Sequence, residues 1–432
     1  MATKTGNSKY LREMNQALIL DIIRTGSGVS RIAIAETTGL SPTAIGIIVK
    51  ELIDEKYVYE VGSGLSSGGR KPMLLKLFPE YWHSLGIDID AGFIYLTLVG
   101  IEGNVIWQKR ENIDDEMISS SGQHVRKNTA LKPINIDHKS HTGMRDKKSK
   151  IEQQPITPED AVHIICRLIV TALEKSGISI WRILGIGISV PGIVDRETRM
   201  IAFAPNLQWR DVDFKDLLLE ELGKVMVAEV DKVRQLQVFV ENESVCSTIC
   251  EKWLGSCKFV DDFVHINIDT GIGAGLFLKG GLYRGTTGSA GEVGHIIVEE
   301  NGPLCTCGNY GCLETLASLD AMIKADGAIS FQEFLQKLHQ GNKKSIAVMK
   351  NASQSLGRAV SILVNTLNPR RIVLGKRFPE YADLALETVR DEVKLKTLSR
   401  PYEQVEVVAG VFGEESSSLG ASILPIRHMM RE

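Results

Sequence analysis

The feature that most constrains this chain is a cluster of one histidine and three cysteines. Of the seven cysteines in the sequence, Cys305, Cys307 and Cys312 fall within eight residues, and His295 lies ten positions before the first of them. One imidazole and three thiolates make a complete tetrahedral set for Zn²⁺, with no position left for water. A closed set is typical of structural zinc, so we expect the metal to brace the fold rather than to do chemistry.

Clustered cysteines can also be incidental or form disulfides. A Cys-x-Cys pair does not easily bridge to itself, and the polar start of the chain does not resemble a secretory signal. Framework-like spacing is also missing from the remaining cysteines, which are Cys166, Cys246, Cys250 and Cys257. We therefore predict reduced thiols, a structural zinc ion and a cytoplasmic protein.

The length of the chain limits the number of domains, and its charge distribution limits the class of partner that it can bind. A chain of 432 residues is too long for one ordinary core, which favours two or three domains. No apolar run reaches the length of a membrane span, so we expect no membrane contact. The net charge of −3 is uneven, because residues 1–76 carry ten Lys or Arg against seven Asp or Glu. This asymmetry by itself is weak support for nucleic-acid binding.

The first 60 residues predict a helix-turn-helix. A first helix is indicated by apolar residues at helical spacing: Leu11, Met14, Leu18, Ile19, Ile22 and Ile23. Ser30 caps a short helix that begins at Arg31 and ends before Gly39. Ser41 caps the next helix, with Pro42 at its first position. The buried face of that helix is expected at Ile45, Ile48, Val49 and Leu52. In a helix-turn-helix, this second helix enters the major groove.

Two short strands and a glycine-rich tip follow the helices. Residues 57–77 predict this hairpin, and its tip holds Gly69, Arg70 and Lys71. A flexible backbone with two cations suits phosphate contact or minor-groove entry. An ordinary small helical domain with a hairpin is the alternative, but the helix order, the tip and the charge favour a winged helix-turn-helix over residues 1–78. The expected DNA contacts are Ser30, Arg31, Ser41, Thr43, Lys50, Gly69, Arg70 and Lys71.

The rest of the chain reads as α/β. Residues 84–99 predict two strands around a turn, and the apolar run 184–190 predicts a strand inside a covered sheet. A cap, a proline and acidic residues begin a helix at Thr157. Residues 263–278 look like a second copy of the opening hairpin, with a glycine-rich turn over 270–275. Two similar α/β lobes with a cleft between them are the expected architecture.

One segment interrupts the α/β pattern. Between Ser121 and Lys150 there are eight Lys or Arg, two Asp and three His, with few large apolar residues. Such a segment cannot build a core, so we predict a flexible insertion over residues 113–154 within a domain that spans 79–432. Contact with DNA is an alternative, although the composition favours a solvated loop.

A series of motifs in a fixed order adds a family resemblance. The motifs are residues 66–72 (SSGGRKP), 190–195 (VPGIVD), 205–211 (PNLQWRD), 240–243 (VENE), 283–285 (YRG) and 291–295 (GEVGH), followed by the cysteine cluster. Together they resemble the ROK family (repressor, ORF, kinase), and within it the xylose repressors of Firmicutes. The resemblance covers nearly the whole chain apart from the insertion and a short piece near residues 228–236. It implies two actin-like, hexokinase-like lobes behind the winged helix, with a sugar pocket between them.

The resemblance also implies which side chains form that pocket. The expected sugar-binding residues are Asn242, Glu292, His295 and Glu314, with Glu243 close by and Asn206 in support. Sugar hydroxyls both donate and accept hydrogen bonds, and carboxylates with an amide satisfy both roles. His295 would place one ring nitrogen on zinc and the other towards the sugar. Without the resemblance, the sequence equally favours a second interpretation, in which Asn242 and Glu243 belong to a surface loop after a buried strand.

The resemblance includes sugar kinases, which hold ATP phosphates in a glycine-rich Asp-x-Gly-Gly-Thr turn. Here the corresponding run begins Asp88-Ile89-Asp90-Ala91, so both glycines are replaced and Asp90 adds a negative charge. The second phosphate loop, residues 270–273, is intact, but repressors keep it too. Glu243 stands in place of the catalytic aspartate and is one methylene longer, a displacement that catalysis tolerates poorly. We therefore predict no enzyme activity, with an ATP-dependent sugar kinase as the alternative.

These features predict a sugar-responsive repressor. A homodimer, or a dimer of dimers, would bind a palindromic operator and be released by an aldose, with xylose as the first candidate. The recognition helix carries Ala44, Gly46 and Ile47 where its relatives have Thr and Ser. Few polar side chains remain there to read bases, and Gly46 weakens the helix by about 1 kcal/mol relative to Ala. A sensor that acts through a protein partner is therefore a third alternative.

Overall fold

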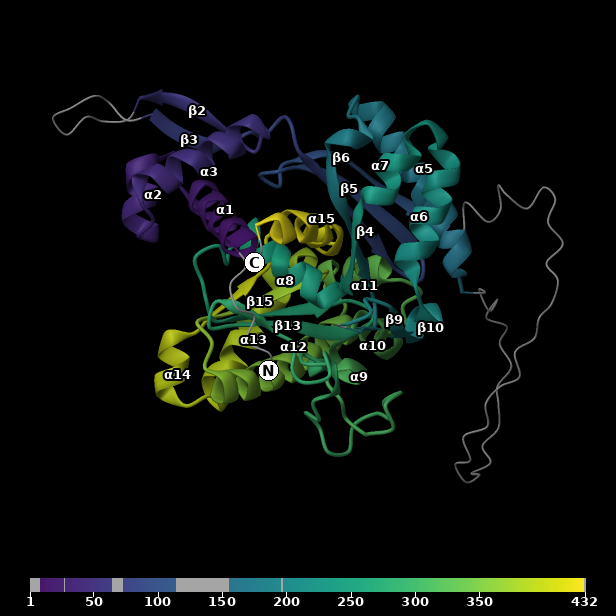
Figure 1. Ribbon diagram of the computed structural model, residues 1–432. Helices are drawn as coiled ribbons and strands as arrows, with labels where there is room; N and C mark the ends of the chain where they lie inside the picture. The colour runs from purple at the N-terminus through teal and green to yellow at the C-terminus, as the bar shows by residue number, and fades with distance from the viewer. Residues whose placement is uncertain (1–7, 27, 64–72, 114–154, 196, 431–432) are drawn as a thin grey trace.

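A computed structural model describes five ranges of the chain: residues 8–26, 28–63, 73–113, 155–195 and 197–430 (Figure 1). The predicted tip residues Gly69, Arg70 and Lys71 lie outside the described residues. So does the predicted insertion, apart from Ile113 at its edge.

The N-terminal part packs three helices against a small antiparallel sheet. The helices are α1 (Ser8–Thr25), α2 (Arg31–Thr38) and α3 (Pro42–Asp54). The strands, in sheet order, are β1 (Val29–Ser30), β3 (Met73–Leu77) and β2 (Val58–Ser63). Ser30 and Ser41 cap α2 and α3 as predicted, each accepting a hydrogen bond at 3.2 Å from the N–H three residues later. Gly39 ends α2 with a φ of 70°. The sequence does not predict β1, because two residues cannot show a period.

Helix α1 buries a different face from the one predicted. Ile19, Leu20 and Ile23 are buried, whereas Leu11, Met14 and Leu18 are 53, 45 and 46% exposed. At about 100° per residue, the exposed three lie on one side of the helix and the buried three on the other. The sequence spacing assigned apolar residues on two sides of the helix to one face. The prediction is therefore wrong for Leu11, Met14 and Leu18, which are exposed.

Lobe I is built on a five-stranded mixed sheet. In sheet order its strands are β11 (Gln237–Asn242), β7 (Ile183–Val190), β4 (His83–Ile89), β5 (Phe93–Gly100) and β6 (Val105–Asn112). Strands β4 to β6 form an antiparallel meander, and β7 and β11 run parallel to β4. One face is covered by α5 (Pro158–Ser176), α6 (Phe214–Val225) and α7 (Val230–Gln235). A small sheet of β8 (Ile193–Val194), β9 (Ile201–Ala204) and β10 (Trp209–Val212) extends from it.

Lobe II repeats this topology, which confirms the predicted second copy. In sheet order its strands are β14 (Gly281–Tyr283), β13 (Ile272–Leu278), β12 (Phe263–Ile268), β15 (Arg371–Lys376) and β16 (Glu406–Ala409). Strands β12 to β14 are antiparallel, and β15 and β16 run parallel to β12. Its helices are α9 (Glu314–Ala317), α10 (Leu319–Asp326), α11 (Phe331–His339), α12 (Lys343–Leu367), α13 (Ala382–Lys396) and α14 (Ser399–Gln404).

The predicted glycine-rich turn over 270–275 is mostly strand. Strand β13 begins at Ile272, and Gly273 and Gly275 pair with β12. A Cβ on these glycines would lie 2.6 Å from Ser244 Oγ and 1.9 Å from Thr248 Oγ1, respectively. The glycines therefore let a helix approach the sheet closely, which is a tertiary contact that a turn-forming residue type does not reveal.

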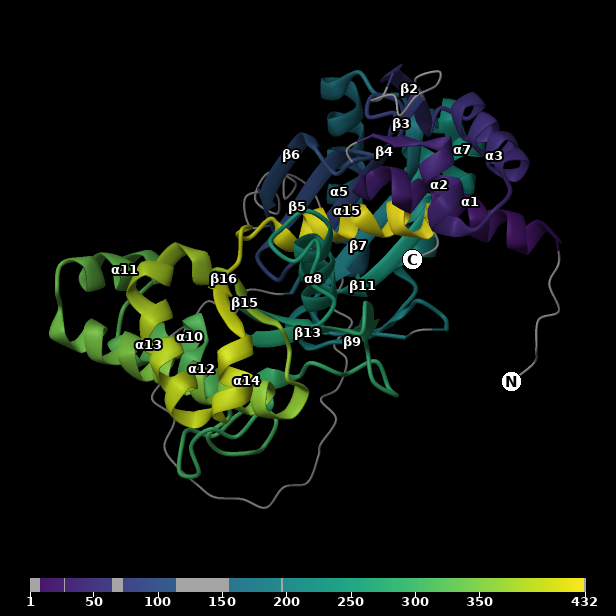
Figure 2. The ribbon, with the colours of Figure 1, turned by 90° about the vertical axis from the view of Figure 1, so that its left-hand side faces the viewer.

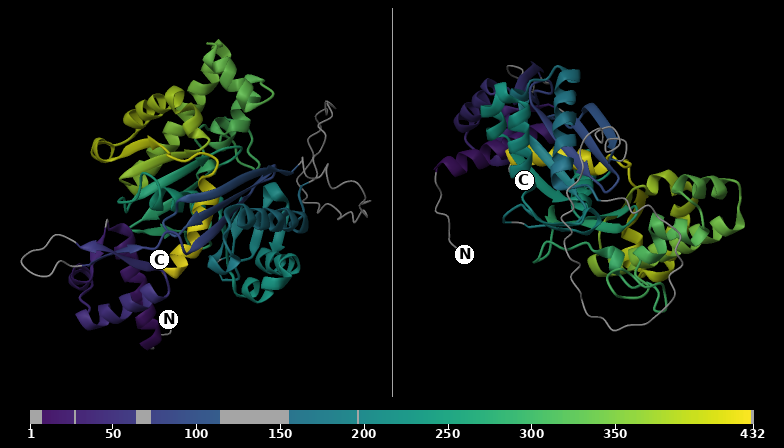
Figure 3. Two further views of the ribbon diagram at one scale, coloured as in Figure 1. Left: turned by 90° about the horizontal axis from the view of Figure 1, so that it is seen from above. Right: turned by 90° about the vertical axis from the view of Figure 1, so that its right-hand side faces the viewer.

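Two central helices lie between the sheets and connect them to the N-terminal part. Helix α8 (Glu243–Trp253) packs on the lobe II sheet and α15 (Ser416–Met429) on the lobe I sheet, and the two helices pack on each other. Close approach depends on glycine, since a Cβ at Gly86, Gly187 or Gly420 would lie 1.7 to 1.9 Å from a backbone oxygen. The views in Figures 2 and 3 place the C-terminal end of α15 beside α1.

The N-terminal part and the central helices share one apolar cluster. It combines Ile19, Leu20 and Ile23 of α1 with side chains of α8 and α15 that include Trp253 and Ile423. The Arg24 guanidinium lies 3.9 Å from the centre of the Trp253 ring, in cation–π geometry. The helix that opens the chain is therefore packed directly on the central helices. Among the described residues, no helix combines the length and the apolarity that a membrane crossing requires.

Candidate functional site

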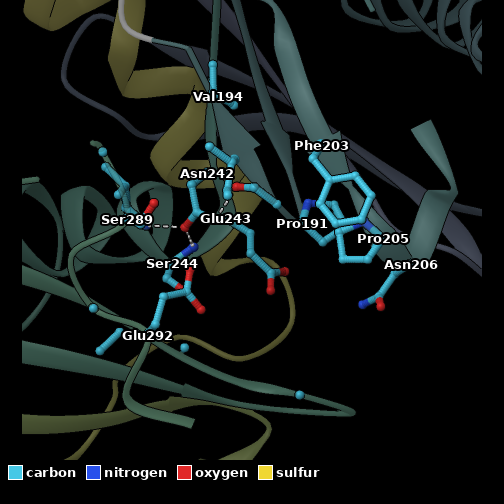
Figure 4. A pocket seen from close by; sticks show the side chains of 18 of the residues that line it. Pro191, Val194, Phe203, Pro205, Asn206, Asn242, Glu243, Ser244, Ser289 and Glu292 are labelled. Atoms are coloured by element: carbon cyan, nitrogen blue, oxygen red, sulfur yellow. Dashed lines mark hydrogen bonds between the residues drawn. The ribbon is translucent and has the colours of Figure 1, made fainter. Parts of the chain in front are cut away.

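A cleft of about 600 Å³ lies between the two lobes. Both lobes line it, together with the start of α8 and the short 3-10 helix η2 (Pro205–Leu207). All six residues predicted to bind sugar line this cleft: Asn206, Asn242, Glu243, Glu292, His295 and Glu314. In Figure 4, the Glu243 side chain points into the space between Glu292 and Asn206. Side chains far apart in sequence are thus brought to one place, while their roles as ligands stay a prediction.

Asn242 is held in place by the protein itself. It is the N-cap of α8, and its Oδ1 accepts hydrogen bonds from the N–H groups of Ser244 and Val245 at 2.9 and 3.4 Å. Its Nδ2 donates to the Gly192 carbonyl at 2.8 Å. An amide oxygen has two lone pairs and an amide NH₂ has two hydrogens. Asn242 therefore has one N–H left for a ligand, and it acts there as a donor.

Glu243 begins α8 and sits among other carboxyl groups. Its side chain is 26% exposed, and its Oε2 lies 3.6 Å from Lys376 Nζ. Burial raises the pKa of Glu243 to about 7; Lys376 opposes this rise, and the nearby carboxylates of Asp88, Asp90 and Asp269 add to it. At neutral pH this carboxyl is therefore close to the midpoint of its titration.

Two further carboxylates reach the cleft from the side of lobe II. Glu314 is the first residue of α9, and its Oε2 accepts a hydrogen bond from the Ile272 N–H at 3.0 Å. This contact fixes the start of β13 against the segment that follows the cysteines. Glu292 is solvent-exposed and carries a carboxylate without a close partner among the described side-chain contacts. The Glu314 carboxylate thus already accepts one hydrogen bond from the protein, whereas the Glu292 carboxylate is free for a ligand.

The predicted metal ligands converge beside the cleft. The four donor atoms of His295, Cys305, Cys307 and Cys312 lie within 4.8 Å of one another. His295 Nδ1 is 3.5 Å from Cys305 Sγ, and Cys307 Sγ is 3.7 Å from Cys312 Sγ. Tetrahedral zinc with Zn–N and Zn–S bonds of about 2.1 and 2.3 Å would set such separations at roughly 3.6 and 3.8 Å. The cluster therefore fits one tetrahedral ion.

The disulfide alternative does not fit the same geometry. All seven cysteines are free thiols, and the sulfur atoms of Cys307 and Cys312 are much farther apart than the roughly 2.05 Å of an S–S bond. His295 Nδ1 is the ring nitrogen on the sulfur side, and the residue also lines the cleft. Its second nitrogen is thus the one available to a ligand.

Comparison with known proteins gives this architecture its family. The model of the ROK family matches residues 137–428, which is more than half of the chain. The chain belongs to the ROK family. Its sequence is 29% identical over 425 residues to the xylose repressor of Bacillus subtilis, and the alignment covers 98% of this chain and 97% of that protein.

Solved structures agree on the ROK fold. A ROK family transcriptional regulator, described as a homologue of the Escherichia coli MLC protein, matches with a TM-score of 0.75 and 22% identity over 98% of this chain and 97% of that chain. A ROK glucokinase from Streptomyces griseus, in complex with glucose and AMPPNP, matches with a TM-score of 0.60 and 22% identity over 79% of this chain and 98% of the kinase. At these identities the likeness establishes the hexokinase-like α/β fold.

The residues predicted to bind sugar do not include every polar group of the cleft. Arg284 of the YRG motif reaches from lobe II to form an ion pair with buried Glu241 of lobe I. Asp269 also lines the cleft, and Lys376 lies behind Glu243. One signal could have found Asp269, since it directly follows the apolar strand β12 at its carboxyl end, where ligands gather in α/β sheets.

The predicted DNA contacts divide into capping, paired and free groups. Ser30 and Ser41 use their hydroxyls as helix caps, and Arg31 pairs with Glu60 at 2.6 Å. Thr43 and Lys50 are exposed on α3. Between them Ile47 is 55% exposed and Gly46 faces open space. The face of α3 that carries Thr43, Gly46, Ile47 and Lys50 is thus uncovered among the described residues.

Proposed function

We propose that this ROK protein is a sugar-responsive transcriptional repressor. Residues 1–78 form a winged helix-turn-helix that binds operator DNA. An aldose, with xylose as the first candidate, binds between the lobes of residues 79–432 and releases the operator. The observation that carries the proposal is the path of α8, which begins with cleft residues and ends against the N-terminal helices.

The uncovered face of α3 supports DNA binding. Its four positions are spaced as one side of a helix, and that side is free to enter a major groove. Lys50 suits a phosphate or a guanine, and the Ile47 side chain suits the methyl group of thymine. This set reads fewer bases than a polar helix would. Phosphate contacts of the tip would then supply a large share of the affinity.

The cleft supports a neutral polyhydroxylated ligand. It offers one N–H of Asn242, the free carboxylate of Glu292, the amide of Asn206 and one nitrogen of His295. This mixture of donors and acceptors matches the hydroxyl groups of an aldose. The name of the Bacillus subtilis relative makes xylose the first sugar to test.

Sugar and DNA are coupled through α8 in this proposal. Asn242 and Glu243 at its start line the cleft, and Trp253 at its end packs under Arg24 of α1. The helix of 11 residues spans about 16 Å. A sugar that binds one position of α8 more tightly shifts the N-terminal helices with it. In a homodimer on a palindromic operator, such a shift changes the spacing of the two recognition helices.

The kinase alternative is disfavoured by the charge of the cleft. Asp90 and Asp269 line it together with Glu243, and buried Asp88 is near enough to Glu243 to raise its pKa. The phosphates of a nucleotide that entered this cleft would meet these carboxylates, and like charges in a partly buried site repel. We also propose that His295, Cys305, Cys307 and Cys312 hold a structural Zn²⁺. That ion would fix the ring of His295 at the wall of the cleft.

The test is a gel-shift with DNA from beside the gene of this protein, with and without a panel of aldoses. We expect a shifted band that xylose or a related aldose abolishes. A Lys50→Ala and Thr43→Ala double variant is the matched control, because it changes the exposed face of α3 without touching its buried side. No shift at low salt contradicts operator binding, and a shift that no sugar relieves contradicts the sensor half and favours a protein partner.

A further inference from the structure

A buried lysine behind Glu243 joins the two lobes. Lys376 ends β15, and its side chain is 1% exposed. Its Nζ lies 3.3 Å from Asp88 Oδ2 of β4 and 3.6 Å from Glu243 Oε2 of α8. It also donates a hydrogen bond to Ser417 Oγ of α15 at 3.2 Å. One ammonium group from lobe II thus contacts the lobe I sheet and both central helices.

The backbone at this position is unfavourable for a side chain. Lys376 has a φ of 59°, in the left-handed region that favours glycine. Strained residues of this kind persist where the surroundings hold them, and they cluster at functional sites. The contacts of the ammonium are the interactions that offset the strain here.

The charge around the ammonium is strongly negative. Four carboxyl groups face it, those of Asp88, Glu243, Asp269 and Asp90. Although burial acts to lower it, the pKa of Lys376 is raised by these carboxyl groups, so the lysine stays charged. For Glu243, burial and the three aspartates all favour the protonated acid, and Lys376 is the group that favours the carboxylate. The fraction of Glu243 that is ionised near neutral pH therefore depends on Lys376.

We propose that Lys376 is a positioning residue of the cleft. It favours the ionised form of Glu243 and fixes its position, so that this carboxylate accepts a hydrogen bond from a hydroxyl of the ligand. Lys376 is not among the residues that line the cleft, and it acts on the ligand only through Glu243. Because Asp88 and Ser417 hold the same ammonium, the position of Glu243 is tied to both lobes. This inference rests on the proposed sugar-binding function.

The first test compares sugar affinity in wild type and Lys376→Met, whose side chain has a similar length and no charge. Calorimetric titration uses D-xylose, D-glucose and other aldoses from acidic to mildly alkaline pH. For the aldose that wild type binds, we expect affinity to fall roughly tenfold or more near neutral pH. Binding should recover as the pH rises, because Glu243 without its counter-charge ionises at higher pH.

Two variants separate this role from a structural one. Lys279 is also a lysine with left-handed backbone, φ 53°, but it is exposed; Lys279→Met should bind sugar as wild type does. Lys376→Gly relieves the backbone strain and removes the ammonium. We expect it to fold and to bind sugar as weakly as Lys376→Met. Wild-type affinity and pH profile in either folded Lys376 variant would overturn the proposal.

A readout without sugar separates this proposal from the proposed function. The carboxyl carbon of Glu243 can be titrated by ¹³C NMR in the free protein, with Glu243→Gln to assign its signal. We expect the midpoint to move to higher pH in Lys376→Met and to stay in place in Lys279→Met. An unchanged midpoint in Lys376→Met contradicts the role of Lys376. If wild type binds no aldose, the sensor function fails, and this titration still decides what Lys376 does.

Discussion

At the scale of single residues, the cleft and the metal cluster meet at His295. Its Nδ1 faces Cys305, and the residue also lines the cleft. A metal ion on the sulfur side would fix the tautomer and the orientation of the ring, which would then present one defined nitrogen to a ligand. In the proposed sensor, a metal held by this cluster would therefore act on sugar recognition and not on DNA.

Removing one cluster thiol should weaken induction before it affects operator binding. Cys307 is the exposed member of the cluster, so Cys307→Ser changes little packing while it removes a metal ligand. We expect bound zinc, measured by atomic absorption, to fall, and more sugar to be needed to release the operator in a gel-shift.

Cys166→Ala is the matched control for this experiment. Cys166 is buried in the core of lobe I, away from the cluster, so this variant should keep its zinc. A Cys307→Ser protein that lost operator binding while it kept its sugar response would show that the assignment is wrong.

Residue types and motif order predicted which side chains line the cleft, but they did not predict the buried residue that holds one of these side chains in place. Asn206, Asn242 and Glu314 were expected at one pocket, and they do line one cleft. Lys376 was not expected, because a lysine after an apolar strand usually points to solvent. Its burial depends on carboxyl groups that are distant in sequence, Asp88 and Glu243, and such a pairing has no local signature.

At the scale of elements, local chemistry predicted helix starts better than helix faces. The caps Ser30 and Ser41 were correct because a capping hydroxyl bonds to an N–H only three residues away. The apolar face of α1 was wrong because the choice between two stripes depends on which one finds a partner. The same reason explains Gly273 of β13, whose place in a strand depends on α8.

Gly46→Ala should stabilise α3. The position lies inside the helix, and a Cβ there would meet no atom within 4 Å. Alanine loses less backbone entropy than glycine, so we expect a gain of about 0.5 to 1 kcal/mol in the unfolding free energy of this part.

Urea denaturation followed by circular dichroism measures this gain, and operator affinity should be measured beside it. Gly39→Ala is the opposite control, since its φ of 70° disfavours any side chain. If Gly46→Ala does not raise the unfolding free energy while Gly39→Ala lowers it, then Gly46 does not reduce the stability of α3.

At the scale of the whole molecule, the two lobes and the N-terminal helices form one connected body. The duplicated sheets were predictable, because both copies open with a hairpin of the same pattern. The contact of α1 with α8 and α15 was not predictable. Its apolar side chains are ordinary core residues, and nothing in their spacing tells which helix they meet.

This contact makes Trp253 a test of communication between the two ends of α8. Trp253→Leu keeps an apolar side chain in the cluster but removes the ring beneath Arg24. We expect operator affinity and sugar affinity, measured separately, to stay near wild type, while the sugar becomes less effective at releasing DNA. In terms of coupling free energy, a loss of 1 kcal/mol would be about a fivefold change.

Trp181→Leu is the control, because that tryptophan is 55% exposed on lobe I. If Trp253→Leu releases DNA at the same sugar concentration as wild type, then α8 does not carry the signal, and α15 becomes the element to test.

The glycines that allow close packing of the central helices determine where this sequence accepts amino-acid substitutions. At Gly86, Gly187 and Gly420 a single added methyl group would overlap a backbone oxygen, and a backbone cannot move aside as a side chain can. A saturating mutational scan should therefore find that these glycine positions accept fewer substitutions than the residues around the cleft. New ligand specificities would then arise from substitutions at the cleft wall, while the packing of the central helices α8 and α15 stays unaltered.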